Sequence, residues 1–263
     1  MTPKDHFDVA MERADHLLRL YDLLHDTRAR KVRADWAAKL MSLMHWPKAE
    51  KIVRVDGKDR NSILILREAA GIDRDKFTHE YLAELLRATV VATVSALDRY
   101  MHDIVVHHSW ALLNRAEDKI PKELKKLQIP VLSARHAVDK IRSDAKARPG
   151  VLVKEALRDQ LHREYTFQRP DDVQKAALML GVDDFWGKVA AAMPNAPKKD
   201  AVIKTLREIA QRRNQIVHEA DIVRKAKAKT ITMRDISAKN ASEWADWMRS
   251  FVVAIDSVVA NAV

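Results

Sequence analysis

The stretch of sequence that decides the fold lies between Leu86 and Leu113 and reads LRATVVATVSALDRYMHDIVVHHSWALL. Apolar residues occupy nearly all sides of a helix drawn through it, so this helix should be the central element of a bundle. Thr78 can cap its first turn, and the helical pattern continues to about Arg115. The stretch therefore predicts an all-α protein built around one long buried helix.

The composition of the 263-residue chain agrees with long helices. Five glycines and eight prolines are few for this length, which disfavours a turn-rich β architecture. The chain has no cysteine, which excludes a disulfide framework and a thiolate metal site. No apolar run is long enough to span a bilayer, and the N-terminus lacks the apolar core of a signal peptide. We expect a cytoplasmic protein that does not associate with membranes.

Residues 1–72 predict an N-terminal helical extension, and residues 73–263 predict the helical bundle. In the extension, apolar faces predict helices over 3–24 and 31–46, which would pack as an antiparallel pair. Residues 51–58 alternate like a short strand but look too isolated to build a sheet, and 63–70 fit a strand or a helix. Further helices are expected at the following positions: 131–141, 151–165, 170–181, 183–194, 200–223 and a C-terminal helix.

The C-terminal helix places five large residues at heptad-like spacing: Trp244, Met248, Phe251, Ile255 and Val258. This face should pack along another helix, either within the bundle or from a second subunit.

The helix expected over 200–223 carries an arginine in its apolar stripe. The stripe consists of Val202, Leu206, Ile209, Ile216 and Ala220. Position 213 is the next slot in it, and an unpaired buried cation is so costly that Arg213 must have an anionic partner, either a carboxylate or the phosphate of a ligand. Asn214 and His218 lie four residues apart on the flank of the same helix. A guanidinium, an amide and an imidazole at one helix edge indicate a site for phosphate chemistry, whereas a purely structural salt bridge of Arg213 is the alternative.

Two aspartates on the central helix are candidates to support this site. Asp98 and Asp103 fit ordinary ion pairs with His102 and Arg99, or one of them orients Arg213 or His218 from across the bundle. The histidines at 102, 107 and 108 lack the spacing of helical metal ligands. We therefore expect no metal site and no cofactor.

The chain carries a formal net charge of +10. Such a charge favours binding of a polyanion through phosphate contacts, although a solvated basic surface is the plainer interpretation. Basic residues flank the arginine motif at Arg212, Arg224, Lys225, Lys227 and Lys229. The run from 224 to 229 is either a solvated loop or an edge that contacts phosphates.

The order Arg213-Asn214 followed by His218 resembles the signature of the HEPN family. Two further phrases support the resemblance: the SALD phrase that ends at Asp98, and the segment from Tyr165 to Val173, which resembles the RiboL-PSP-HEPN branch. The resemblance covers about residues 75–225. It implies a helical bundle of the HEPN type, with Arg213, Asn214, His218 and Asp98 as the catalytic set.

The same resemblance implies a function. Many HEPN proteins are metal-independent endoribonucleases in which the 2′-OH of RNA attacks the phosphate and leaves 2′,3′-cyclic phosphate ends. We expect a homodimer that brings two motifs into one cleft, with RNA as substrate. The expected setting is phage defence or a toxin–antitoxin system, with an antitoxin or defence partner. The alternatives are a non-catalytic HEPN-like module that binds RNA or a protein, and a helical assembly protein that uses its C-terminal heptad face.

Overall fold

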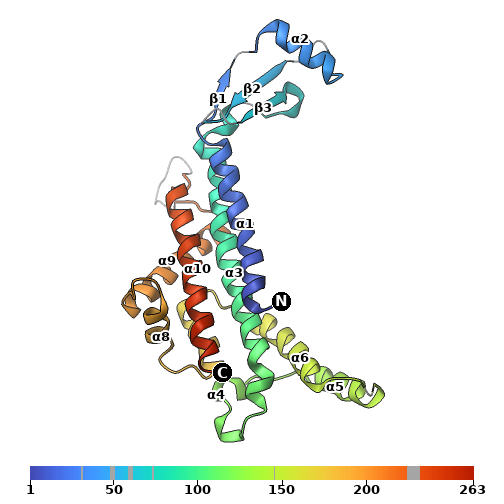
Figure 1. Cartoon of the computed structure of the whole chain (residues 1–263), viewed down its shortest axis with the longest axis vertical. Helices are drawn as coiled ribbons and strands as arrows, with labels where there is room; N and C mark the ends of the chain where they lie inside the picture. Colours follow the sequence, from blue (N-terminus) through green and yellow to red (C-terminus); the bar gives the residue numbers. More distant parts are fainter. Residues whose placement is uncertain (31, 48–50, 59–61, 73, 145, 224–231) are drawn as a thin grey trace. The chain divides into compact units, whose positions relative to one another are not determined.

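The structure is a computed structural model of the whole chain (Figure 1), and it describes residues 1–30, 32–47, 51–58, 62–72, 74–144, 146–223 and 232–263. These residues form ten α-helices and three short strands, which confirms the expected all-α class. The chain divides into two compact units. The first unit, called the bundle unit below, comprises Met1–Arg13, Val90–Arg234 and Glu243–Val263, and the second, the sheet unit, comprises Ala14–Thr89 and Asp235–Ser242.

The two units do not follow the boundary expected between residues 72 and 73. The first thirteen residues belong to the bundle unit, where Phe7 is fully buried and its ring packs edge-on against Tyr100 at 5.9 Å between centroids. His6 Nδ1 lies 3.0 Å from Asp103 Oδ2 in the same unit. The start of the chain is therefore part of the bundle core rather than part of an appended extension.

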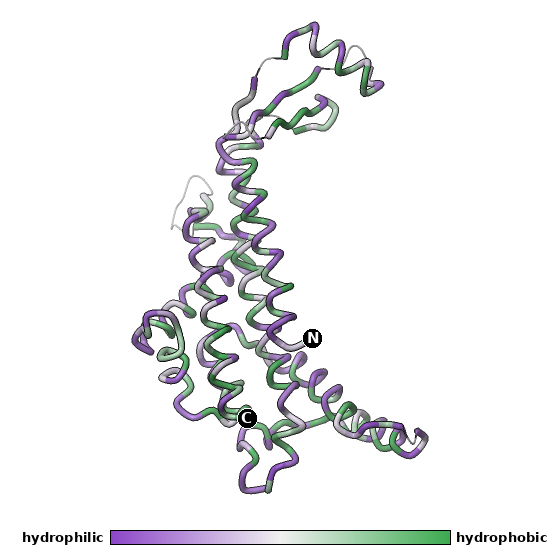
Figure 2. Tube along the Cα trace, in the orientation of Figure 1, coloured by the Kyte–Doolittle hydropathy of each residue, from purple (hydrophilic) through white to green (hydrophobic). Residues whose placement is uncertain are grey.

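The core of the bundle unit is built on α3 (His79–Leu113), as the central apolar stretch predicts. From Val90 onward its buried side chains include Val94, Leu97, Tyr100, Met101 and Ile104. The last helix, α10 (Ala238–Ala260), buries Met248, Phe251 and Ile255 within the same chain. Figure 2 shows hydrophobic residues recurring along both helices. Tyr100 donates a hydrogen bond of 3.0 Å to Asp256, so the C-terminal heptad face packs inside the bundle.

Shorter helices complete the bundle unit. They are α4 (Lys122–Lys125), α5 (Val131–Ser143), α6 (Pro149–Glu164), α7 (Pro170–Met179), α8 (Phe185–Ala192) and α9 (Lys199–His218), with a 3-10 turn at Glu117–Lys119. Gly181 has φ +73°, a left-handed conformation that glycine adopts without strain, so the chain turns sharply soon after α7. The helices over 151–165, 170–181 and 183–194 were thus expected to within a few residues.

The sheet unit contains a three-stranded antiparallel sheet in the order β1-β2-β3, formed by β1 (Arg28–Arg30), β2 (Ile52–Asp56) and β3 (Ile63–Arg67). The prediction that residues 51–58 are too isolated to build a sheet is therefore wrong. Strand β2 pairs along its whole length with β3, and its end also pairs with β1. Residues 63–70, which fit either element, form the strand β3 followed by a 3-10 turn at Glu68–Ala70.

Helix α1 (Pro3–Leu24) has the expected bounds, and α2 (Ala34–Leu43) is shorter than expected. None of the residues of α2 is buried, and β1 separates the two helices along the chain. The expected packing of these helices as an antiparallel pair is therefore wrong. A 3-10 turn at Arg74–Phe77 leads into α3. Among the described residues, no helix combines the length and hydropathy that crossing a membrane requires.

Candidate active site

Helix α9 carries the candidate site on its last two turns. It buries Val202, Leu206 and Ile209 of the expected apolar stripe, together with Ala210, whereas Ile216 and Ala220 of that stripe are not buried. The helix ends at His218 rather than at Val223, because Ala220 and Asp221 both adopt positive φ (49° and 57°) and a right-handed helix cannot continue through them. His218 is therefore the final residue of the helix.

The chain reverses direction after α9, so that Asp221 packs back against this helix. The Asp221 backbone amide donates a hydrogen bond to the carbonyl of Gln215 at 2.9 Å. The Asp221 carboxylate accepts hydrogen bonds from both terminal nitrogens of Arg212. Asp221 is 1% exposed and the Arg212 side chain 11% exposed. The buried arginine paired to a carboxylate is thus Arg212, whereas the stripe predicted a buried cation at Arg213, with either a carboxylate or a ligand phosphate as its partner. This correction also leaves Arg212 engaged inside the protein rather than presented to RNA.

The three motif side chains come together at the end of α9. Arg213 Nη1 lies 3.2 Å from Asn214 Oδ1 and 3.5 Å from His218 Nε2, the latter at the outer limit of a hydrogen bond. The arginine spans the five positions to His218 by extending along the helix. Its Nε is buried and has no hydrogen-bond partner among the described residues. A buried donor without an acceptor is costly, by about 1–3 kcal/mol, so this guanidinium is suited to receive the oxygens of an anionic ligand.

The imidazole of His218 faces this cation. A guanidinium only donates hydrogen bonds, so Nε2 would be the acceptor in this contact, which requires the tautomer that carries its proton on Nδ1. His218 is exposed, which leaves the ring open to a substrate. The pair therefore combines a permanent cation with an accessible proton acceptor.

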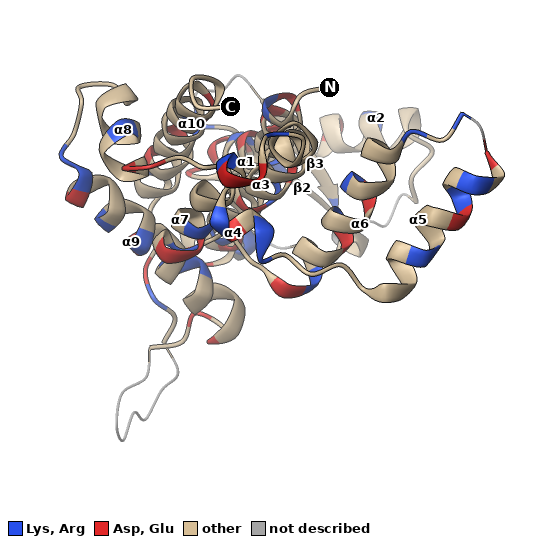
Figure 3. Ribbon diagram, turned by 90° about the horizontal axis from the view of Figure 1, so that it is seen from below, with Lys and Arg blue, Asp and Glu red and all other residues tan. Residues whose placement is uncertain are grey.

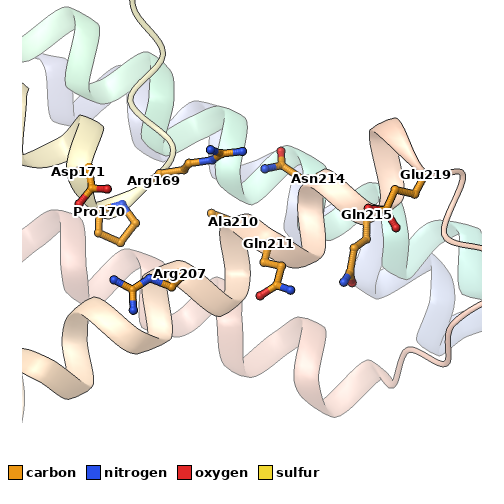
Figure 4. A pocket seen from close by; sticks show the side chains of 9 residues that line it. All are labelled: Arg169, Pro170, Asp171, Arg207, Ala210, Gln211, Asn214, Gln215 and Glu219. Atoms are coloured by element: carbon orange, nitrogen blue, oxygen red, sulfur yellow. The ribbon is translucent and has the colours of Figure 1, made fainter. Parts of the chain in front are cut away.

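A pocket of about 430 Å³ lies next to the motif (Figure 4). Helix α9 and the residue after it line one side with Arg207, Ala210, Gln211, Asn214, Gln215 and Glu219. The other side is formed by Arg169, Pro170 and Asp171 at the start of α7. In Figure 4 the side chains of Arg169 and Asn214 point toward each other. The sequence pattern assigns no role to Arg169 or Arg207, although Arg169 lies inside the Tyr165–Val173 segment that carries the family resemblance.

The two candidate aspartates on α3 have other partners. Asp98 accepts a hydrogen bond from the Phe167 amide at 2.5 Å and one from Gln168 Nε2 at 3.0 Å. Asp103 accepts from Arg99 Nε at 2.8 Å and lies beside His6. Among the described residues neither carboxylate contacts Arg213 or His218, which corrects the expectation that Asp98 orients them directly. Asp98 instead fixes the segment that leads into Arg169.

A cluster of aromatic rings packs against the segment that leads into Arg169. The rings of His102 and His162 stack at 4.4 Å, and His102 also packs against Phe167 at 4.6 Å. Burial, together with the neighbouring His102, lowers the pKa of His162 below its ordinary value. The described residues contain no group of three or more His, Asp or Glu arranged to hold a metal ion.

Some of the basic residues around the motif lie on α9, and others lie outside the described residues. Figure 3 shows Lys and Arg residues along α9, among which Arg207 is exposed. Four residues expected to contact RNA lie outside the described residues: Arg224, Lys225, Lys227 and Lys229. Their role stays a prediction.

The helical bundle and the convergent arginine, amide and histidine define a protein of the HEPN class. A model of the RiboL-PSP-HEPN family matches residues 58–261, which is most of the chain, so the chain belongs to the RiboL-PSP-HEPN family. This match is longer than the resemblance seen in the sequence, which covers about residues 75–225. It begins at residue 58 and extends through α10. No curated protein and no solved structure matches the chain. Membership of a HEPN family suggests a role in nuclease or RNA biology.

Proposed function

We propose that this protein is a metal-independent endoribonuclease whose reacting groups lie at the end of α9. One observation carries the proposal. The guanidinium of Arg213 has no carboxylate partner among the described residues, holds a buried Nε without an acceptor, and lies beside Asn214 and His218. Its neighbour Arg212 is already paired with Asp221, so Arg213 is the cation that remains for an incoming phosphate.

RNA carries its own nucleophile, and this determines what the protein has to supply. The 2′-oxygen forms a bond to the adjacent phosphorus while the bond from phosphorus to the 5′-oxygen of the next nucleotide breaks. The 2′-OH gives its proton to a base, and the departing 5′-oxygen takes up a proton. The products are a 2′,3′-cyclic phosphate and a 5′-hydroxyl.

The motif side chains fit the needs of this reaction. Nε2 of the exposed His218 accepts the 2′-OH proton once phosphate oxygens replace the imidazole as acceptors for Arg213. Arg213 then stabilises the negative charge that builds up on the phosphorane, in a partly buried site where such stabilisation is strongest. The amide of Asn214 holds a non-bridging oxygen or keeps the guanidinium in place.

A two-fold homodimer would supply the second proton-transfer group. The reaction uses one base and one acid, whereas the described residues of a single chain bring one imidazole, that of His218, to the motif. We propose that two copies of the α9 end face one another, so that one His218 acts as base and the other as acid. The basic residues from 224 to 229 would guide a single RNA strand along this groove. The proposed setting is phage defence or a toxin system with a neutralising partner.

The experiment that tests the function is an RNA cleavage assay in excess EDTA, with chemical typing of the product ends. We expect cleavage with 2′,3′-cyclic phosphate and 5′-hydroxyl ends, and its loss in Arg213→Met and His218→Ala. Arg142→Gln, which removes an exposed arginine on α5, is the matched control and should cleave like wild type. Wild-type protein that binds RNA without cutting it would instead favour a non-catalytic RNA-binding module.

A further inference from the structure

The pocket beside the motif has the size of a ligand site. Its volume of about 430 Å³ falls in the range of small-molecule pockets. It lies between the start of α7 and one face of α9, two helices whose packing is part of the bundle core. A rigid framework on both sides means that the lining side chains need little rearrangement to receive a ligand.

Arg169 is held at the rim of this pocket by its neighbours on both sides. Before it, the Asp98 carboxylate binds Phe167 and Gln168. After it, Pro170 is buried as the first residue of α7 and restricts Arg169 to an extended backbone, observed at φ −101° and ψ 158°. The backbone of Arg169 is thus fixed while its side chain is exposed, and Figure 4 shows that side chain reaching over the pocket.

The side chains that line the pocket favour a ligand that carries both a negative charge and a ring with hydrogen-bonding edges. Glu219 is paired with Arg234 at 3.3 Å, and Asp171 lies in the first turn of α7, where the helix dipole favours a carboxylate. Arg169 and Arg207 have no ion pair among the described residues. Three amides also line the pocket: Gln211, Asn214 and Gln215. Amides present a donor and an acceptor side by side, the pattern that nucleobase edges match, and guanidinium planes stack on bases.

Asn214 joins this pocket to the reacting groups. Its side chain lines the pocket and its Oδ1 lies 3.2 Å from Arg213 Nη1. A ligand in the pocket would therefore be a direct neighbour of a phosphate held at Arg213. We propose that the pocket binds the nucleotide adjacent to the scissile phosphate, with Arg169 and Arg207 holding its base or phosphate and the amides contacting the base edge. This proposal rests on the proposed function and names the substrate unit that the site selects.

Direct binding tests the pocket without requiring catalysis. The probes are the four nucleoside 3′-monophosphates and ribose 5-phosphate, which lacks a base, titrated into wild type, Arg169→Gln, Arg207→Gln and the control Arg142→Gln. We expect at least one nucleotide to bind wild type and the control equally, and about tenfold or more weaker to each pocket variant. Ribose 5-phosphate should bind about tenfold or more weaker than that nucleotide. Absence of nucleotide binding, or equal binding of ribose phosphate, would overturn the proposal.

Cleavage mapping then separates this proposal from the proposed function. On RNA of random sequence in EDTA, wild type should prefer one or two bases at a fixed position next to the cut. In Arg169→Gln, the ratio of cleavage at preferred and other bases should fall about tenfold. If wild type cuts and both pocket variants keep its preference and nucleotide affinity, the pocket proposal is wrong while the function stands. If nucleotides bind in the pocket and no RNA is cut, the pocket is a nucleotide site, but the proposed function and the placement of the pocket beside a scissile phosphate are both wrong. Melting curves identify any variant that fails to fold, and the second arginine variant then decides the question.

Discussion

Arg212 and Asp221 form a buried ion pair across the end of α9, although they lie nine positions apart in the sequence. The pair exists because Ala220 and Asp221 turn the chain back on the helix. It gives two neighbouring arginines opposite tasks: Arg212 holds the chain reversal, and Arg213 beside it keeps a buried Nε without an acceptor. The difference between these two residues leads directly to a paired experiment.

Replacing each of the two arginines by methionine should have opposite effects. Arg212→Met leaves the Asp221 carboxylate buried and uncompensated, so it should lower the free energy of unfolding by about 3–5 kcal/mol. Arg213→Met removes a cation without leaving a buried carboxylate, so the unfolding free energy should change by less than about 1 kcal/mol while RNA cleavage falls about 100-fold or more. Urea unfolding and the cleavage assay measure both. A larger loss of stability in the Arg213 variant would support a structural salt bridge at that position.

Asp98 should act as a positioning residue for the pocket. Asp98→Asn weakens the hydrogen bonds to Phe167 and Gln168, and we expect a loss of about 1–3 kcal/mol in unfolding free energy. Because Asp98 fixes the segment before Arg169, the variant should also raise KM with little change in kcat. Asp103→Asn is the matched control, since Asp103 binds Arg99 and His6 instead, and it should leave KM unchanged. Equal KM values in the two variants would show that Asp98 does not position the pocket.

His162 should titrate below the ordinary histidine value, because burial and the stacked ring of His102 lower its pKa. The folded state then binds fewer protons than the unfolded state. The stability contributed by neutral His162 is therefore fully present above the unfolded pKa of about 6.5 and is lost as pH falls from there through the lowered folded pKa. NMR titration of the ring and melting curves between about pH 5 and pH 7.5 measure this. A His162 pKa above 6.5 would contradict the stacked arrangement.

The proposed homodimer predicts complementation between inactive variants. Light scattering at micromolar concentration should give twice the mass of one chain. Mixtures of Arg213→Met and His218→Ala should regain part of the activity if residues from two subunits act on one phosphate, or each variant should inhibit wild type by subunit exchange. A stable monomer with full nuclease activity would rule out the shared site.

Long periodic patterns explain what could be predicted from the sequence. The apolar run of α3 and the stripe of α9 determine helices by local spacing, and the grouping of Arg213, Asn214 and His218 follows from helical geometry plus one extended side chain. The sheet was missed because β1, β2 and β3 are short and pair across loops, so no local window contains the evidence.

The exchange of roles between Arg212 and Arg213 could not be predicted for a different reason. It depends on two left-handed residues at Ala220 and Asp221, neither of which is a glycine that would signal such a turn. The pocket was missed because it joins Arg169 to α9 across a long separation in sequence. The tertiary contacts of Asp98 with Phe167 and Gln168, together with the buried Pro170, hold Arg169 there.

In the proposed mechanism the 2′-OH of RNA is the nucleophile at Arg213 and His218, so removing that hydroxyl at one position should stop cleavage there. An RNA oligonucleotide containing a mapped cleavage site is compared with the same oligonucleotide carrying a single 2′-deoxynucleotide on the 5′ side of the scissile phosphate, in excess EDTA. We expect wild-type protein to cut the all-RNA strand and to leave the substituted bond intact, while other sites in the same strand are still cut. Cleavage of the 2′-deoxy bond at the wild-type rate would contradict it.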